Sequence, residues 1–184
     1  MHEFKVYNVT NAPSDSRVDL EKIKLNHGNI PNVYGIMAES PWLLKGHVAL
    51  KELFEKTTLN KQERKIVLLT ASRENESTYC TAVYSGAAEK HNVPIEVIEA
   101  VRAGKSLKDK KLEALRSFTA EVVNERGQVD EGDVKDFLDA GYTRANILEI
   151  VLAVGMVTLT NYTNLIAKTS LDVQFEPKLW KKAS

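Results

Sequence analysis

The segment from Ile147 to Leu159 is apolar on almost every face when it is drawn as a helix. A helix at the surface of a globular protein needs only one apolar stripe, so a helix of this kind should be buried on all sides. The segment contains Glu149 and is shorter than the roughly 20 apolar residues that cross a bilayer, so we expect no membrane span. It predicts instead the central helix of a folded domain.

Helical patterns also run through the rest of the chain. From Leu107 to Arg126 apolar residues recur every three or four positions, and Gly127 supplies a stop. Pro41 suits the first turn of a helix that would turn Trp42 and Leu53, among others, toward a core. No segment alternates apolar and polar residues for long enough to make a strand. The sequence therefore predicts an all-α fold.

The length of 184 residues suits a single all-helical domain. Asp19 is the predicted start of the first helix, which leaves residues 1–18 as an extended N-terminal segment, mobile or loosely docked. Residues 41–172 would form the core of the domain, and residues 173–184 would form a C-terminal tail.

Charge and cysteine content narrow the setting. Lysine and arginine number 25, and so do aspartate and glutamate. A neutral chain has no overall field that attracts nucleic acid or an anionic membrane, so neither is an expected partner. The N-terminus has no cationic start followed by an apolar run, and a single cysteine cannot form an intrachain disulfide. These observations predict a cytoplasmic protein.

The apolar excess of residues 147–159 also bears on assembly. A small helical domain rarely encloses such a helix alone, so we expect part of it to pack against another subunit. Ala153 and Gly155 would allow a close approach there. The alternative is a central helix in the core of a monomer; we expect a homo-oligomer.

Cys80 is the only cysteine and the first candidate for chemistry. Helical spacing places Ser77, Cys80 and Tyr84 on one side of a helix. Ser77 suits the N-cap, which puts Cys80 in the first turn, where the positive end of the helix dipole favours a thiolate. Free cysteine is also among the most often buried residue types, so Cys80 is either a reactive thiol or a core side chain.

Three stretches carry a resemblance to a known family. They are LNKQERKIVLLTASRENESTYCTAVYS, the run from VRAGKSLKDKK to ANILEIVLAV, and NYTNLIAKTSLDVQF. From about Pro41 to Trp180 the chain resembles the alkylhydroperoxidase D-like branch of the carboxymuconolactone decarboxylase family. The resemblance implies an all-helical fold that forms homo-oligomers.

Active members of that family look like thiol peroxidases built on C-x-x-C-x-x-x-H, with a glutamate on the preceding helix. In this chain Ser77 stands in place of the first cysteine, and Cys80 is the second. Tyr84 replaces the histidine, Lys65 replaces the glutamate, and Leu165 stands where many relatives have a further histidine. Without a second cysteine, an oxidised Cys80 would need an external thiol reductant.

Two functions stay open at this point. One is a peroxiredoxin-type antioxidant oxidoreductase reduced to one cysteine, with Cys80 as nucleophile, Lys65 stabilising its thiolate and Tyr84 donating a hydrogen bond to peroxide. The other is a catalytically silent oligomeric binding protein in which Cys80 is structural. Lactone decarboxylation, the chemistry of the family's other branch, would need a positioned acid–base group, and Glu74 and Glu76 look solvated.

No cofactor or metal is implied. The four histidines have no metal-ligand spacing, and we expect His47 to be an ordinary half-buried side chain of an amphipathic helix. No glycine-rich phosphate-binding motif is present. Asn161, Tyr162 and Asn164 follow the apolar segment, and we expect them to satisfy neighbouring backbone groups or a subunit contact, or else to line a pocket.

Overall fold

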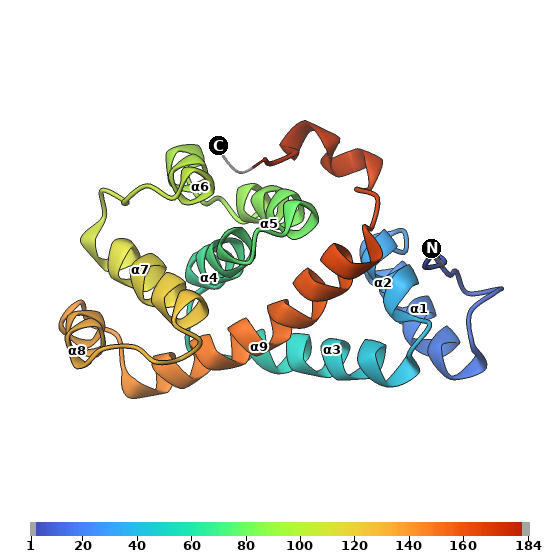
Figure 1. Cartoon of the computed structure of the whole chain (residues 1–184), viewed down its shortest axis with the longest axis horizontal. Helices are drawn as coiled ribbons and strands as arrows, with labels where there is room; N and C mark the ends of the chain where they lie inside the picture. Colours follow the sequence, from blue (N-terminus) through green and yellow to red (C-terminus); the bar gives the residue numbers. More distant parts are fainter. Residues whose placement is uncertain (1–2, 182–184) are drawn as a thin grey trace.

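The computed structural model describes residues 3–181, which contain helices and no strand. The helices are α1 (Ser14–His27), α2 (Asn32–Met37), α3 (Pro41–Phe54), α4 (Lys61–Glu74), α5 (Thr78–Lys90), α6 (Ile95–Ala103), α7 (Lys110–Asn124), α8 (Glu131–Asp139), α9 (Arg144–Ala167) and the 3-10 helix η1 (Val173–Lys178). Figure 1 shows α9 crossing the molecule beside α3, with α4 and α5 on its other side. The predicted all-α fold is confirmed.

The longest helix, α9, begins with a capping box. Thr143 Oγ1 accepts a hydrogen bond from the Asn146 N–H at 3.2 Å, and Asn146 Oδ1 accepts one from the Thr143 N–H at 2.9 Å. The face of α9 that buries Ile150, Ala153 and Met156 lies between α3 and α4. This face makes α9 the central helix of the fold.

The opposite side of α9 has no cover within residues 3–181, where Leu148 is 70% exposed. The prediction of a helix buried on all sides is therefore wrong for the single chain, because the neighbouring helices leave residues such as Leu148 and Val151 uncovered. α9 is also longer than the predicted apolar segment, and its 24 residues could cross a membrane by length and composition alone. The central helix of a soluble protein passes the same test, so this is weak evidence for a span.

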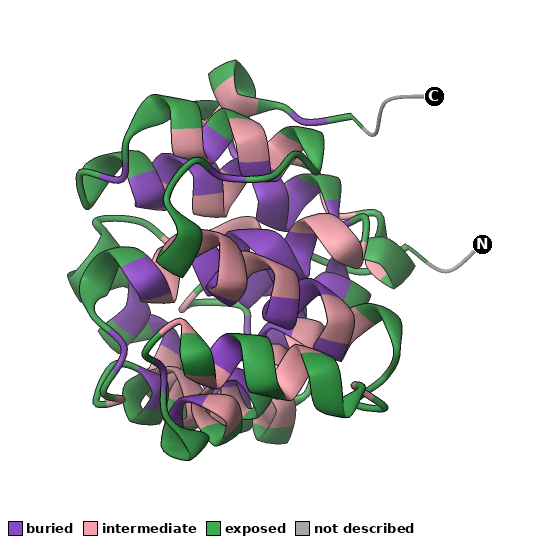
Figure 2. Ribbon diagram, turned by 90° about the vertical axis from the view of Figure 1, so that its left-hand side faces the viewer, coloured by how far each residue is buried: buried purple, intermediate pink, exposed green. Residues whose placement is uncertain are grey.

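Two clusters of buried side chains hold the helices together, and Figure 2 shows the buried residues concentrated in the interior. The larger cluster joins α4, α7 and α9 and includes Leu69, Leu115 and Ile150. The smaller one joins α1, α2 and α3 to the first turn of α5 and includes Leu20 and Cys80. Cys80 thus lies where the N-terminal helices meet the rest of the domain.

The N-terminal segment is more ordered than predicted. α1 begins at Ser14, directly after Pro13, rather than at Asp19. Ala12 and Ser16 are buried, and Ser16 Oγ donates to the Ala38 carbonyl at 2.7 Å. Residues 14–18 are therefore helical, which corrects the extended segment expected over residues 1–18; residues 1–2 lie outside the described part.

The C-terminal residues are docked onto α5 and α6. η1 packs against α5, and the Arg102 guanidinium donates to the carbonyls of Lys178 at 3.0 Å and Leu179 at 3.2 Å. The buried Trp180 ring donates in turn to the Arg102 carbonyl at 2.9 Å. The predicted tail over residues 173–184 is thus a packed segment as far as residue 181, and residues 182–184 are not described.

The buried face of α3 differs from the predicted one. Leu44, His47 and Phe54 point inward, whereas Trp42 is 75% exposed and Leu53 is also exposed. The prediction that Trp42 and Leu53 face a core is wrong, because the buried positions of α3 lie on another face of the helix. That face brings His47 to the site described next.

Candidate ligand-binding cavity

The turn between α4 and α5 positions Cys80. Glu76 adopts a left-handed backbone conformation with a φ of 55°, and the chain then enters α5. Ser77 Oγ accepts a hydrogen bond from the Cys80 N–H at 3.4 Å and caps the helix. The predicted N-cap and the place of Cys80 in the first turn are both present in the structure.

The Cys80 thiol is 3% exposed. Asn164 Nδ2 on α9 donates a hydrogen bond to its sulfur at 3.2 Å. Burial raises the pKa of the Cys80 thiol, and hydrogen bonds from Ser77, Thr160, Asn161 and Asn164 oppose that rise without cancelling it. Cys80 is therefore a neutral thiol at pH 7, in contrast to the thiolate that the helix dipole alone would favour.

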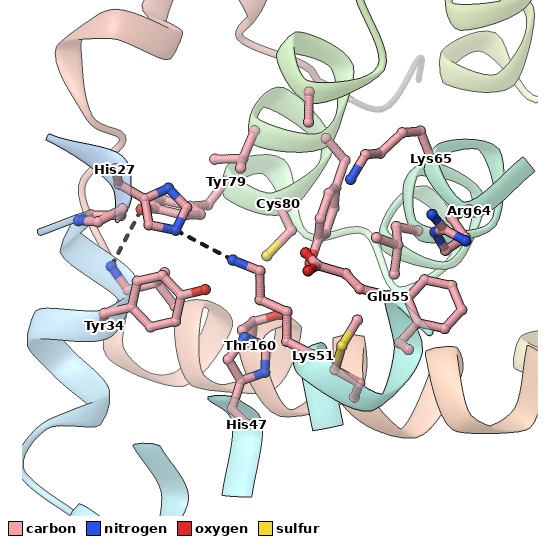
Figure 3. A pocket seen from close by; sticks show the side chains of 18 of the residues that line it. His27, Tyr34, His47, Lys51, Glu55, Arg64, Lys65, Tyr79, Cys80 and Thr160 are labelled. Atoms are coloured by element: carbon pink, nitrogen blue, oxygen red, sulfur yellow. Dashed lines mark hydrogen bonds between the residues drawn. The ribbon is translucent and has the colours of Figure 1, made fainter. Parts of the chain in front are cut away.

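A cavity of about 350 Å³ opens beside Cys80 (Figure 3). Its walls come from α3, α4, α5 and α9, from Phe175 of η1, and from residues 27–34. The apolar lining residues are Pro31, Val33, Phe54, Leu68, Val83, Ala87, Met156 and Phe175. The predicted site residues Cys80, Tyr84 and Lys65 all line this cavity, whereas Ser77 lies behind the wall as a cap.

Tyr84 and Lys65 are both half-buried. Burial raises the pKa of Tyr84 well above its ordinary value, and the nearby Cys80 and Tyr34 raise it further. Tyr84 is therefore a hydrogen-bond donor and cannot serve as the base that a histidine would supply. Burial lowers the pKa of Lys65, and the charged groups that act on its ammonium are Glu55, Lys51 and Arg64. The predicted pairing of Lys65 with a Cys80 thiolate is absent from these interactions.

His47 is the site residue that sequence reasoning missed. It lines the cavity, is 2% exposed, and lies 5.6 Å from the Tyr34 ring between centroids. Burial, and then the charge of Lys51, lower the pKa of His47 to about 4, although the Met156 carbonyl accepts a hydrogen bond from the ring. The imidazole is therefore neutral at pH 7. Its spacing of three from Leu44 and seven from Phe54 was the only signal that it faces inward.

The polar residues near the end of α9 divide between two roles. Asn161 is buried, donates to Ser72 Oγ at 3.3 Å and accepts from Asn75 Nδ2 at 2.9 Å. Asn164 donates its hydrogen bond to the Cys80 sulfur, while Tyr162 is exposed. Asn161 thus fastens α9 to α4, and Asn164 is the partner of the thiol.

The structure offers little support for the other chemistries considered from sequence. Glu74 pairs with Arg73 at 2.8 Å, and neither residue lines the cavity. Glu55 is the only carboxylate among the lining residues. Within residues 3–181, no group of three or more histidine, cysteine, aspartate or glutamate side chains could hold a metal ion.

Comparisons with known proteins find likeness in structure only. No protein-family model matches the sequence, and no curated protein matches it. An uncharacterised peroxidase-related protein from Ralstonia eutropha JMP134, described as an alkylhydroperoxidase AhpD core, is 18% identical, with a TM-score of 0.79 over 98% of this chain and 100% of that one. A peroxidase-related protein from Silicibacter sp. TM1040 is 17% identical, with a TM-score of 0.78 over 95% of each chain.

A third similar structure has a different activity. The debrominase Bmp8, in its C82A form in complex with 2,3,4-tribromopyrrole, is 14% identical, with a TM-score of 0.80 over 97% of this chain and 96% of that one. Likeness at such identities shows the fold alone. This chain therefore has the all-α AhpD-like fold, which also occurs in peroxidase-related proteins and in a debrominase.

Proposed function

We propose that this chain binds a small organic molecule in the cavity beside Cys80 and that Cys80 is a neutral side chain of the cavity wall. The observation that carries the proposal is the pairing of a buried, unionised thiol with a cavity of about 350 Å³. Ligand pockets commonly span about 300–1,000 Å³, and a peroxide alone would leave most of this space empty. The homo-oligomer expected from sequence is part of this proposal.

The remaining wall groups fit binding better than peroxide reduction. The place of a base is held by Tyr84, a donor, and the place of a carboxylate is held by Lys65, so these two positions no longer supply the base and the carboxylate of a proton relay. Bmp8, which shares the fold, is known in complex with a brominated pyrrole, so the fold can hold a small ring compound.

One observation favours a second candidate, a one-cysteine peroxidase. Asn164 donates to the Cys80 sulfur at 3.2 Å, and such donors stabilise a thiolate. In that reaction the thiolate attacks one peroxide oxygen, the O–O bond breaks, and a sulfenic acid forms together with water or an alcohol. One external thiol would then form a mixed disulfide with Cys80 and release water, and a second external thiol would release the reduced Cys80 as the two external thiols leave as a disulfide.

The pH dependence of alkylation, followed by intact mass after mild peroxide, distinguishes the two candidates. For the binding protein we expect slow alkylation of the folded chain with an apparent pKa above the free value of about 8.5, and no stable oxygen adduct. An apparent pKa well below that value together with a sulfenic acid adduct would establish the peroxidase instead. Cys80→Ala is the control, because any mass it gains reports oxidation of other residues.

Binding itself is tested with neutral fragments by ligand-observed NMR. Ala87→Trp places an indole at a half-buried lining position and should abolish binding to the cavity. Val18→Trp adds the same ring at an exposed position of α1 and should leave binding unchanged. Fragments that bind both variants equally would show that the cavity is not the site.

A further inference from the structure

The charged side chains that line the cavity are unbalanced. The cations Lys51, Arg64, Lys65 and Lys90 face one carboxylate, that of Glu55. The chain as a whole has 25 charges of each sign, so the excess is local. A cavity lined mainly by one sign of charge concentrates its potential on ions of the opposite sign.

Lys51 and Lys65 are the two cations best placed to meet a ligand. Both are half-buried, and neither forms an ion pair with a residue between positions 3 and 181. Lys51 Nζ lies 3.3 Å from His27 Nε2, whereas Arg64 is engaged by the carbonyls of Thr57 and Leu59. Partly buried charges are costly without a partner, so these two ammonium groups provide a site for an anion.

The excess of cations affects the pKa values of the titratable groups that line the cavity. Burial lowers the pKa of each of four titratable groups on the walls, and neighbouring lysines or arginines lower it further in each case. These groups are His27, His47, Lys65 and His91. Glu55 acts in the opposite direction on Lys65 but leaves the pKa of Lys65 lowered. The charges that lower these pKa values belong to the cations, and Glu55 opposes them at His27, Lys65 and His91.

His47 adds a second requirement. A neutral imidazole has one donor nitrogen and one acceptor nitrogen, and its N–H is directed to the Met156 carbonyl. Nδ1 is buried and has no hydrogen-bond partner among the described residues. Figure 3 shows the ring rising from α3 toward the cavity, beside Tyr34 and below Thr160. A buried ring nitrogen without a partner can be satisfied by a polar group of a ligand.

We propose that the cavity takes an organic carboxylate that also carries a hydroxyl or N–H group, with the carboxylate held by Lys51 and Lys65 and the donor bound to His47. The apolar body of the molecule would lie against Leu68 and Phe175. This inference rests on the proposed binding function and names the class of its ligand. Figure 3 shows Lys51 and Lys65 entering the cavity from different helices, with the Lys51 ammonium beside His27 and the Glu55 side chain between the two lysines.

The test uses 4-hydroxyphenylacetate and 6-hydroxyhexanoate as probes, titrated into the full chain by calorimetry. Each acid is compared with its amide, which lacks the charge, and with its counterpart lacking the hydroxyl. We expect at least one hydroxy acid to bind about tenfold more tightly than either relative, the change that follows from losing one charge-assisted or buried hydrogen bond. Comparable affinity for acids and amides would overturn the proposal.

Variants locate the contacts. Lys51→Met and Lys65→Met should each weaken the acid about tenfold and leave the amide unchanged, whereas Lys110→Met on the exposed start of α7 should change neither. His47→Gln, which keeps an acceptor, should retain the preference for the hydroxyl, and His47→Phe should abolish it. A variant that also loses affinity for the amide would be a variant with disturbed folding. The comparison of the acids with their amides on the unaltered chain would then decide whether the cavity binds the carboxylate.

The outcomes separate this inference from the proposed function. If neutral fragments bind and the acids do not, the cavity is a binding site and the anion proposal is wrong. If neither class binds, both proposals fail. Inorganic phosphate serves as a further probe: displacement of the hydroxy acids by phosphate at equal concentration would contradict a site built for an organic carboxylate.

Discussion

Among single residues, His47 makes the free energy of unfolding depend on pH. Its pKa falls from 6.5 to about 4 in the folded protein. Between these pH values His47 is therefore protonated in the unfolded chain and neutral in the folded chain, which favours the unfolded chain. This contribution to stability is complete above pH 6.5 and is lost as the pH falls through about 4. A shift of this size corresponds to about 3 kcal/mol.

Comparison of the unaltered chain with His47→Gln isolates this effect. Glutamine does not titrate, so the free energy of unfolding of the unaltered chain should drop more steeply between pH 7 and pH 4 than that of the variant, by up to about 3 kcal/mol. Urea denaturation at a series of pH values measures both slopes. Parallel slopes would mean that His47 is not buried as a neutral ring. His27 and His91, whose pKa values are also lowered, contribute equally to both proteins.

The site residues differ in how far the sequence could predict them. Ser77 was predictable as the cap, because capping depends on neighbours in the chain. His47 was not, because its partner Met156 lies on another helix and only the packing of α3 on α9 brings them together. The state of Cys80 was also beyond the sequence, because the burial that raises its pKa comes from helices distant along the chain.

At the scale of elements, two glycines give a matched prediction about the N-terminal segment. A Cβ on Gly35 would lie 2.6 Å from Val6 Cγ1 and 2.8 Å from the Tyr7 carbonyl, where α2 meets the N-terminal segment. Gly35→Ala should therefore destabilise the protein by about 1–3 kcal/mol. Gly46 is exposed in the middle of α3, and a Cβ added there would meet no other described element within 4 Å, so Gly46→Ala should stabilise the protein by about 1 kcal/mol.

Thermal unfolding of both variants checks this pair. A stable Gly35→Ala protein would mean that residues 3–9 do not dock on α2 as the Tyr7 N–H to Gly35 carbonyl hydrogen bond of 3.1 Å indicates. That docking is what the sequence could not predict, because Val6 and Tyr7 belong to no periodic pattern. The start of α9 has a strong local signal in the capping box at Thr143, whereas the apolar pattern of residues 147–159 covers only the middle of this helix.

For the whole molecule, the exposed apolar stripe of α9 bears on assembly. The stripe consists of Leu148, Val151, Gly155, Tyr162, Leu165 and Ile166, which are exposed in the single chain and share one face at spacings of three, four and seven. An exposed apolar stripe of this length is costly in water and suits the same helix of a second copy, with Gly155 allowing close approach. The proposed homo-oligomer would bury it, whereas the sequence pattern alone could not tell this face from the one that packs on α3 and α4.

Charge placed on the stripe tests this assembly. Leu148→Lys with Val151→Lys should convert the oligomer to a folded monomer at micromolar concentration, because each copy would bring two ammonium groups without partners into the contact, and burying unpaired charges is strongly unfavourable. Leu25→Lys, at a more exposed apolar position on α1, should leave the oligomer intact. Light scattering gives the mass of each protein in solution. A monomeric unaltered chain would contradict the proposed homo-oligomer. The cavity would then have to bind its ligand within a single chain.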